Sequence, residues 1–265
     1  MEQTFATREP ILVTVEIPAG RIDVEGTETE ETHVGIERVG RELDPSKIEV
    51  DLREEGGRQH LVIRARHTRF GNGRYRAAIT THAGADLRIE TAAADVRLRG
   101  AFGDADVHSA SGDMEAGEVR GNARMRSASG NLTVSDVHGE TELHSVSGRL
   151  RVGRAQGRAD LHSVSGSVTV DEAMSAVVVQ TVSGDIRLGS IAKGDVMLHS
   201  VSGDIEVGIG VGAKAFIDAH SMSGRMRSDL EMSDTPGTPG EPDVDVRANT
   251  MSGNVTIRRS GRAAA

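Results

Sequence analysis

The stretch that decides the fold is "LHSVSGSVTV", residues 161–170, which has two close copies, "LHSVSGRLRV" at 143–152 and "LHSVSGDIEV" at 198–207. All three contain the anchor Ser/Thr-x-Ser-Gly, whose glycine recurs every 18 residues before the spacing widens to 19, 21 and 29 residues. We expect these glycines at corners, because glycine tolerates positive φ and close backbone approach. They are Gly112, Gly130, Gly148, Gly166, Gly184, Gly203, Gly224 and Gly253.

Apolar and polar residues alternate between the corners. Leu150 and Val152 flank the polar Arg151, and the same pattern recurs at 168–170. Period-two alternation predicts strands with one buried face. Two short strands and two corners in each period predict an all-β fold, a single-stranded parallel β-helix (β-solenoid) of about 18-residue coils. In this fold equivalent residues of neighbouring coils stack about 4.8 Å apart.

The N-terminal part of the chain lacks the anchor. Its segments "ILVTVEIPAGRIDVEG" (11–26) and "KIEVDLREEGG" (47–57) predict antiparallel or edge strands with turns. We therefore expect a β cap region at 1–82, covering the first coil of a solenoid at 83–259. Within the last coil, the Pro-, Gly- and acid-rich segment 231–245 predicts a loop insertion, and residues 260–265 predict a disordered tail.

Composition excludes some classes of function. The net charge of −9 would repel phosphates, so we expect no nucleic-acid partner. The start of the chain has no basic segment followed by an apolar one, and no stretch is long and apolar enough to cross a bilayer. These features predict a cytoplasmic protein without a transmembrane segment. The alternative is export or surface association by a non-classical route.

Serines form the most regular columns, three residues and one residue before each anchor glycine. A serine nucleophile needs one site with a histidine base, an orienting acid and an oxyanion hole. Eight equal copies of the anchor argue against such a site, so we expect no catalytic residues and no bound cofactor. The hydroxyls are expected to hydrogen-bond along the stack and to the backbone at the corners.

A histidine ladder stands four residues before the anchor glycines. It comprises His108, His144, His162, His199 and His220. Consecutive coils should place His144 beside His162 and His199 beside His220, and two imidazoles at that spacing could share a divalent ion. We favour an exposed polar ladder, because a parallel column forms no tetrahedral cage and Arg126 interrupts it. Protonated imidazoles in a stack repel each other, so mild acid should weaken this face.

An apolar column, the Val/Met stripe, stands two residues before the anchor glycines. Its larger members are Val146, Val164, Val182, Val201, Met222 and Met251. Strict alternation places the stripe outside, where it would bind a partner or form a self-association seam. The alternative is a bulge before the corner that turns these residues inward.

The repeated "SVSGDI" and "TVSGDIRL" units, preceded by "ILVTVEIPAGRIDVEG", resemble the DUF4097 family of bacterial β-strand-repeat proteins. Its members are often labelled "putative adhesin" and are related to the toastrack domains of envelope-stress systems. The resemblance covers roughly residues 10–258. It implies a parallel β-helix-like fold and no established enzymatic activity, and it supplies no functional residues.

These observations favour a non-enzymatic scaffold or interaction module that binds a protein partner or itself. The resemblance suggests a connection to envelope-stress signalling. The first alternative is a surface adhesin that binds glycan or protein. The second is a carbohydrate-active enzyme, which would need clustered acids in a cleft; here the acids are spread along the edges.

Overall fold

The computed structural model describes residues 1–40, 42–65, 73–230 and 242–261. The chain divides into two compact units, Met1–His138 and Gly139–Ala265, and each is described here by itself. In the described residues the only helix is the short 3-10 turn η1 (Pro45–Lys47) of the first unit. Both units are otherwise built of strands, and the predicted β-solenoid is confirmed.

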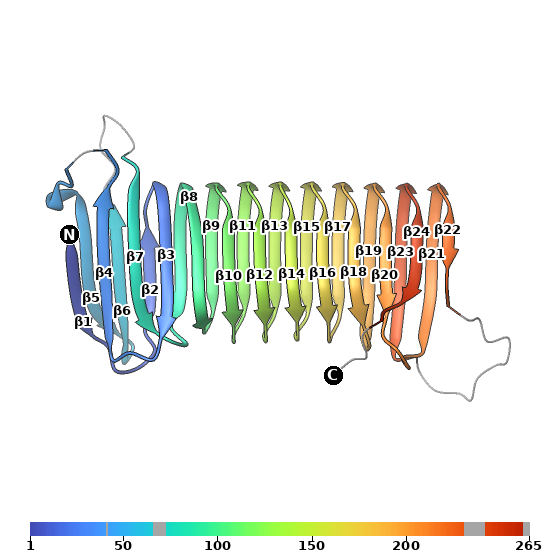
Figure 1. Ribbon diagram of the computed structural model, residues 1–265, viewed down its shortest axis with the longest axis horizontal. Helices are drawn as coiled ribbons and strands as arrows, with labels where there is room; N and C mark the ends of the chain where they lie inside the picture. The colour runs from blue at the N-terminus through green and yellow to red at the C-terminus, as the bar shows by residue number, and fades with distance from the viewer. Residues whose placement is uncertain (41, 66–72, 231–241, 262–265) are drawn as a thin grey trace. The chain divides into compact units, whose positions relative to one another are not determined.

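The second unit is a stack of coils, each of which gives one strand to each of two walls (Figure 1). The first wall contains β13 (Thr141–Ser147), β15 (Ala159–Ser165), β17 (Val177–Ser183), β19 (Gly194–Ser202), β21 (Ala215–Ser223) and β23 (Val244–Ser252). The second wall contains β14 (Leu150–Ala155), β16 (Val168–Ala173), β18 (Ile186–Ile191), β20 (Ile205–Ile209), β22 (Met226–Ser228) and β24 (Val255–Arg259). Paired strands are parallel and in register, so Leu143 lies beside Leu161, as predicted.

A thin aliphatic layer fills the space between the two walls. Leu150, Val168 and Ile186 lie in one inward column and are buried, because alternation turns every second side chain toward the interior. Full burial of such a side chain contributes about 1.5–3 kcal/mol. At the corner, Gly166 has φ +149°, and a Cβ there would overlap the carbonyl oxygen of Gly148. The tight corner therefore requires glycine.

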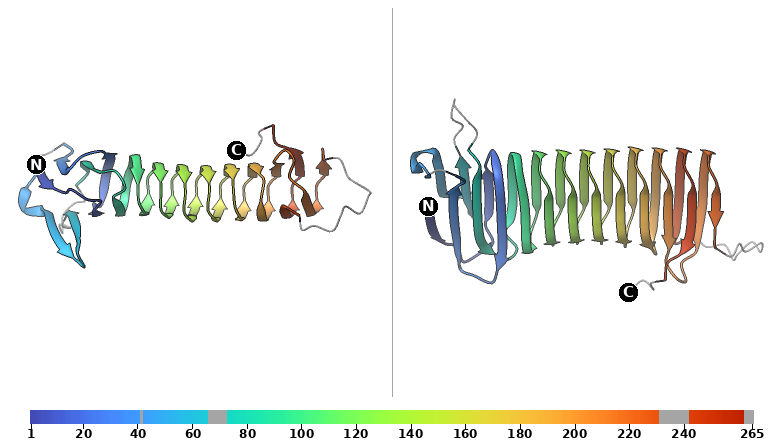
Figure 2. Two further views of the ribbon diagram at one scale, coloured as in Figure 1. Left: turned by 90° about the horizontal axis from the view of Figure 1, so that it is seen from below. Right: turned by 45° about the horizontal axis from the view of Figure 1, so that its top comes forward.

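The last coils of this unit do not stack in sequence order. β23 pairs with β19 on one side and with β21 on the other, and β24 likewise lies between β20 and β22. In Figure 1 the red strands β23 and β24 stand between the orange pairs, and Figure 2 shows the same order from two further directions. We call β23–β24 the inserted coil and β21–β22 the open coil.

The inward residues explain this order. The inserted coil presents Val246 and Ile257 to the interior, and both are buried. In the open coil, Ser228 occupies the position that pairs with Ile257. If the open coil lay inside the stack, the hydroxyl of Ser228 would be buried among aliphatic side chains. Such burial costs free energy unless the hydroxyl has a hydrogen-bond partner. The more apolar coil therefore takes the interior place, and the prediction that consecutive coils are always neighbours is wrong here.

Two expectations at the C-terminal end need correction. Residues 231–241 of the expected loop lie outside the described residues, but Val244 and Asp245 belong to strand β23. Ser260, expected in the tail, is buried, and its hydroxyl lies 2.9 Å from that of Ser190. Residues 262–265 lie outside the described residues.

The first unit combines parallel coils with antiparallel strands. Its strands are β1 (Glu2–Ala6), β2 (Leu12–Glu16), β3 (Ala19–Thr27), β4 (Glu31–Arg38), β5 (Ile48–Glu55), β6 (Arg58–Ala65), β7 (Tyr75–His82), β8 (Asp86–Phe102), β9 (Ala105–Ser111), β10 (Met114–Val119), β11 (Ala123–Ser129) and β12 (Leu132–Val137). The long strand β8 pairs in parallel with two strands: its first half pairs with β9 and its second half with β10. β9 and β10 pair in turn with β11 and β12. Antiparallel pairs β1–β4, β4–β7 and β5–β6 cover the outer layer, as expected of a β cap.

Strands β2 and β3 correct the expectation for residues 11–26. They are parallel, not antiparallel, and neither is an edge: β2 lies between β6 and β8, and β3 between β7 and β8. They form a complete coil, the covered coil, whose corner is Gly20 at φ +129°. Sequence reasoning missed this coil because it lacks the Ser-x-Ser-Gly anchor. The predicted boundary at residue 82 stays a prediction.

Candidate functional site: an exposed apolar stripe beside a histidine ladder

The Val/Met stripe is exposed on the first wall of the second unit. Its exposed fractions range from 38% at Val201 to 81% at Met222. In the observed coil order it runs through Val146, Val164, Val182, Val201, Met251 and Met222. Six coils about 4.8 Å apart give a row about 24 Å long. The alternative in which a bulge turns this column inward is wrong.

A side-chain hydrogen bond supports one of the corners beside the stripe. Ser145 and Ser163, just before stripe residues, point inward and are buried, whereas Ser147 and Ser165, just after, are exposed. The Ser145 hydroxyl donates to the carbonyl oxygen of Ser147 at 3.2 Å, which is the side chain to backbone bond expected of the serine columns. The buried hydroxyls of Ser163 and Thr181 have no hydrogen-bond partner among the described residues, so this bond is not common to all coils.

Further apolar side chains widen the exposed surface. Val178 and Met197 lie side by side on β17 and β19, in the column two residues before the ladder. Most coils carry a charged residue in this column. Val178 and Met197 are apolar instead, and Met197 is 47% exposed. Sequence reasoning did not single out this pair, although the same alternation that defined the stripe could have found it.

The histidine ladder lies between these apolar columns. The rings of His144 and His162 are neighbours, as predicted, with centroids 4.8 Å apart in an edge-to-face arrangement. Each imidazole faces a carboxylate two residues earlier on its own strand: Nε2 of His144 is 3.4 Å from Glu142, and Nε2 of His162 is 2.7 Å from Asp160. Each ring therefore has a carboxylate as well as the neighbouring imidazole beside it. The weakening of this face in mild acid stays a prediction.

The remaining ladder members do not form one continuous row. His199 and His220 both pair with Asn249, which separates them, so the prediction that they are adjacent is wrong. In the first unit, His108 pairs with Arg126 and lies 2.8 Å from Asp106. Within the described ranges, no group of three or more His, Asp or Glu side chains is placed to hold a metal ion.

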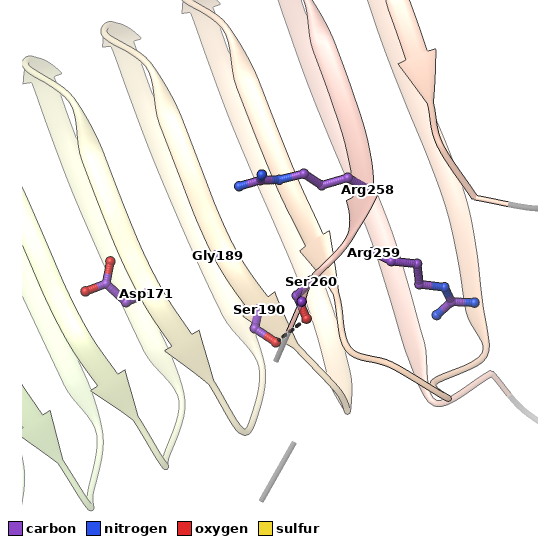
Figure 3. Close-up of a pocket in the computed structure, with 7 residues that line it drawn as sticks. Asp171, Gly189, Ser190, Arg258, Arg259 and Ser260 are labelled. Atoms are coloured by element: carbon purple, nitrogen blue, oxygen red, sulfur yellow. Dashed lines mark hydrogen bonds between the residues drawn. The ribbon is translucent and has the colours of Figure 1, made fainter. Parts of the chain in front are cut away.

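A pocket of the second unit lies where the chain leaves β24 (Figure 3). It is lined by Asp171, Gly189, Ser190, Arg258, Arg259, Ser260 and Gly261. Arg258 is ion-paired with Glu206 at 2.7 Å, and Arg259 donates to the backbone carbonyl of Ala213 at 2.8 Å. Figure 3 shows the two guanidinium groups pointing in opposite directions, so they do not converge on one bound group.

The stacked coils and the flat exposed wall define the class of protein: a β-solenoid repeat protein with a surface suited to contact. In the part of the chain that the structure describes, no helix is both long and apolar enough to span a membrane. The model of the Toastrack DUF4097 family matches residues 12–258, and the chain belongs to this family.

Three solved structures match this chain at low identity and with TM-scores below 0.5. A "putative adhesin" from Bacteroides fragilis gives a TM-score of 0.45 at 14% identity, covering 98% of this chain and 96% of that one. A second "putative adhesin", from Parabacteroides distasonis, gives 0.41 at 9% identity with the same coverage. A "putative cell adhesion protein" from Clostridium sporogenes gives 0.32 at 10% identity, covering 98% and 99%. No curated protein matches the chain.

Proposed function

We propose that this protein is a non-enzymatic interaction module that binds a protein partner through the Val/Met stripe. The single observation that carries the proposal is the in-register row of six exposed apolar side chains in the second unit. Isolated exposed apolar residues are ordinary, but a contiguous row marks an interaction surface. Partner binding would remove this row from water.

The geometry of the wall indicates what kind of surface fits. The stripe lies on a regular parallel sheet, so its side chains project from one nearly flat wall. Exposed serines such as Ser147 and Ser165 border it on one side, and the histidine ladder borders it on the other. An apolar centre with a hydrogen-bonding rim is the anatomy of a protein–protein interface. The partner that fits is an extended apolar segment or strand face with polar flanks.

Several finer predictions belong to the same proposal. The cytoplasmic location and the link to envelope-stress signalling stay predictions from the sequence and the family. The alternative of a surface adhesin requires the protein outside the cell, so fractionation distinguishes the two. A carbohydrate-active enzyme would need converging acids; in the described residues, Asp171 is the only acid of the pocket in Figure 3, and it is ion-paired with Arg151 at 2.7 Å.

The test is a pull-down from native lysate with wild-type protein and the variant Val164→Ser/Val182→Ser/Val201→Ser. We expect the variant to lose specific partners and to keep its melting temperature within about 5 °C, because each of the three surface substitutions changes stability by less than about 0.5 kcal/mol. The matched control Val39→Ser/Met174→Ser/Val211→Ser removes three exposed apolar side chains outside the stripe. Partners retained by the stripe variant, or lost equally by the control, would contradict the proposal.

A further inference from the structure

Among the residues that the structure describes, none covers the interior layer of the open coil in the second unit. Among the described strands, β21 pairs only with β23, and β22 only with β24. Met226 is 55% exposed, although Ile205 and Val255 in the same inward column are 1% exposed. Unpaired strand edges above an uncovered apolar layer are a template for pairing with another chain.

The backbone of β21 directs hydrogen-bonding groups toward this open side. The carbonyl oxygen of Lys214 accepts from the N–H of Val244 on the inserted coil, at 3.1 Å. Successive residues of a parallel strand direct their N–H and C=O groups to opposite sides, so Ile217, Ala219 and Ser221 direct theirs outward from the stack. None of these three is proline, so each has an N–H to donate to a pairing strand.

The chemistry of β21 is self-complementary about Ala219. The side chains of β21 that are exposed on the first wall are Phe216 and Asp218 before Ala219, and His220 and Met222 after it. If a second β21 runs antiparallel with Ala219 opposite Ala219, each aspartate stands opposite a histidine and each phenylalanine opposite a methionine. A histidine N–H can donate to an aspartate oxygen, and hydrogen-bonded and apolar cross-strand pairs both stabilise an antiparallel pair. The same register makes Ala219 a hydrogen-bonded pair, in agreement with its outward backbone groups.

We propose that the occupant of this edge is a second copy of the chain, docked through a two-fold axis at Ala219. The two β21 strands pair antiparallel, and the inward layer of each open coil, including Ile217 and Met226, covers that of the other. A second copy matches the open coil in cross-section, whereas a single extended peptide would pair with only one of its two strands. The contact is isologous and closes on itself, so it yields a dimer.

The first measurement is the mass of the full chain in solution by light scattering or sedimentation, over a range of concentrations. We expect the mass of two chains, dissociating to one chain on dilution. The variant His220→Asp places carboxylates opposite each other at both symmetric positions of the interface. Each aspartate that faced an imidazole then faces a second carboxylate, so we expect the dimer dissociation constant to rise at least about tenfold.

The exchange variant Asp218→His/His220→Asp is the decisive arm. It restores an aspartate opposite a histidine across the two-fold axis while keeping one aspartate and one histidine on each strand, so we expect it to regain the wild-type dimer. The side chains of both residues are about half exposed or more, so both variants should melt like the wild type. A wild type that is monomeric at every concentration overturns the proposal, and an exchange variant as weak as His220→Asp overturns this register.

A separate arm distinguishes this edge from the Val/Met stripe. The variant Val164→Ser/Val182→Ser/Val201→Ser leaves β21 and β22 unchanged, so it should form the dimer like the wild type. Loss of the dimer in this variant would assign self-association to the stripe and overturn the proposal for the open coil.

Discussion

The covered coil β2–β3 of the first unit and the open coil β21–β22 of the second show two outcomes of stacking out of sequence order. In the first unit, a coil made early in the chain lies between two coils made later, and antiparallel strands cover the outer layer. In the second, the coil made last lies inside, and no described strand covers an earlier one. In both units the coil at the interior place buries aliphatic side chains, such as Val13 and Val246.

The strongest test of this comparison uses engineered disulfides, because the chain has no cysteine. In the observed order, Val201 and Met251 lie on adjacent coils, about 4.8 Å apart along the stack, which is within disulfide range. Val201 and Met222 lie two coils apart. We expect nearly complete crosslinking of Val201→Cys/Met251→Cys on oxidation and almost none of Val201→Cys/Met222→Cys, measured by mobility under non-reducing conditions. The reverse result would mean that the coils follow sequence order.

The next largest effect concerns the corner of the covered coil. At Gly20, φ is +129° and a Cβ would overlap the carbonyl oxygen of Tyr75 on the neighbouring strand. Backbone strain and overpacking together predict that Gly20→Ala lowers the free energy of unfolding by about 3–5 kcal/mol. Chemical denaturation measures it, and Gly40→Ala, at φ +78° with no atom within 4 Å of the added Cβ, separates strain from overlap. Equal losses of unfolding free energy in the two variants would mean that the overlap at Gly20 costs nothing beyond the backbone strain.

The interior column offers a comparison at smaller scale. Ile205 is buried, whereas Met226 in the same column of the open coil is not. We expect Ile205→Ala to cost about 3 kcal/mol through lost burial and a cavity, and Met226→Ala to cost less than about 1 kcal/mol in the monomer at low concentration. Denaturation curves for the two variants measure the difference. Similar costs would show that the open coil is covered in solution.

The smallest effect concerns an ion pair that joins the covered coil to β6. Arg64 donates two hydrogen bonds of 2.6 Å to Glu16, and these bonds lower the pKa of that carboxyl below its ordinary value. The stabilisation is complete above the ordinary pKa of a glutamate and is lost as the pH falls through the lowered value. We expect Glu16→Gln to lower the melting temperature by about 1 °C at pH 7 and not at all in strong acid. A difference that grows in acid would contradict this sign; Glu9→Gln, an exposed glutamate before β2, is the control.

Much of the fold could be predicted from the sequence because the stacking is local and repetitive. The alternation around Leu150 and the spacing of the anchor glycines determine strands, corners and register. The stacking order could not be predicted, because β21 and β23 carry the same anchor and either could pair with β19. The difference lies in single inward residues such as Ser228, whose effect depends on whether a further coil covers them.

The candidate site was predictable to the same extent. Alternation placed the Val/Met stripe outside, but a bulge remained an alternative, because the corner leaves two successive residues, such as Val146 and Ser147, on the outside. The exposed layer around Met226 carries no sequence signal of its own. It follows from the position of the open coil in the stack, which depends on contacts between segments distant in the chain.

The place of the inserted coil has a consequence for biosynthesis. Residues 215–228 leave the ribosome before 244–259, so the strands of the outer coil are made before those of the coil beneath it. Premature termination before Val244 would remove an internal coil of the stack and leave β21 and β22 without the strands they pair with.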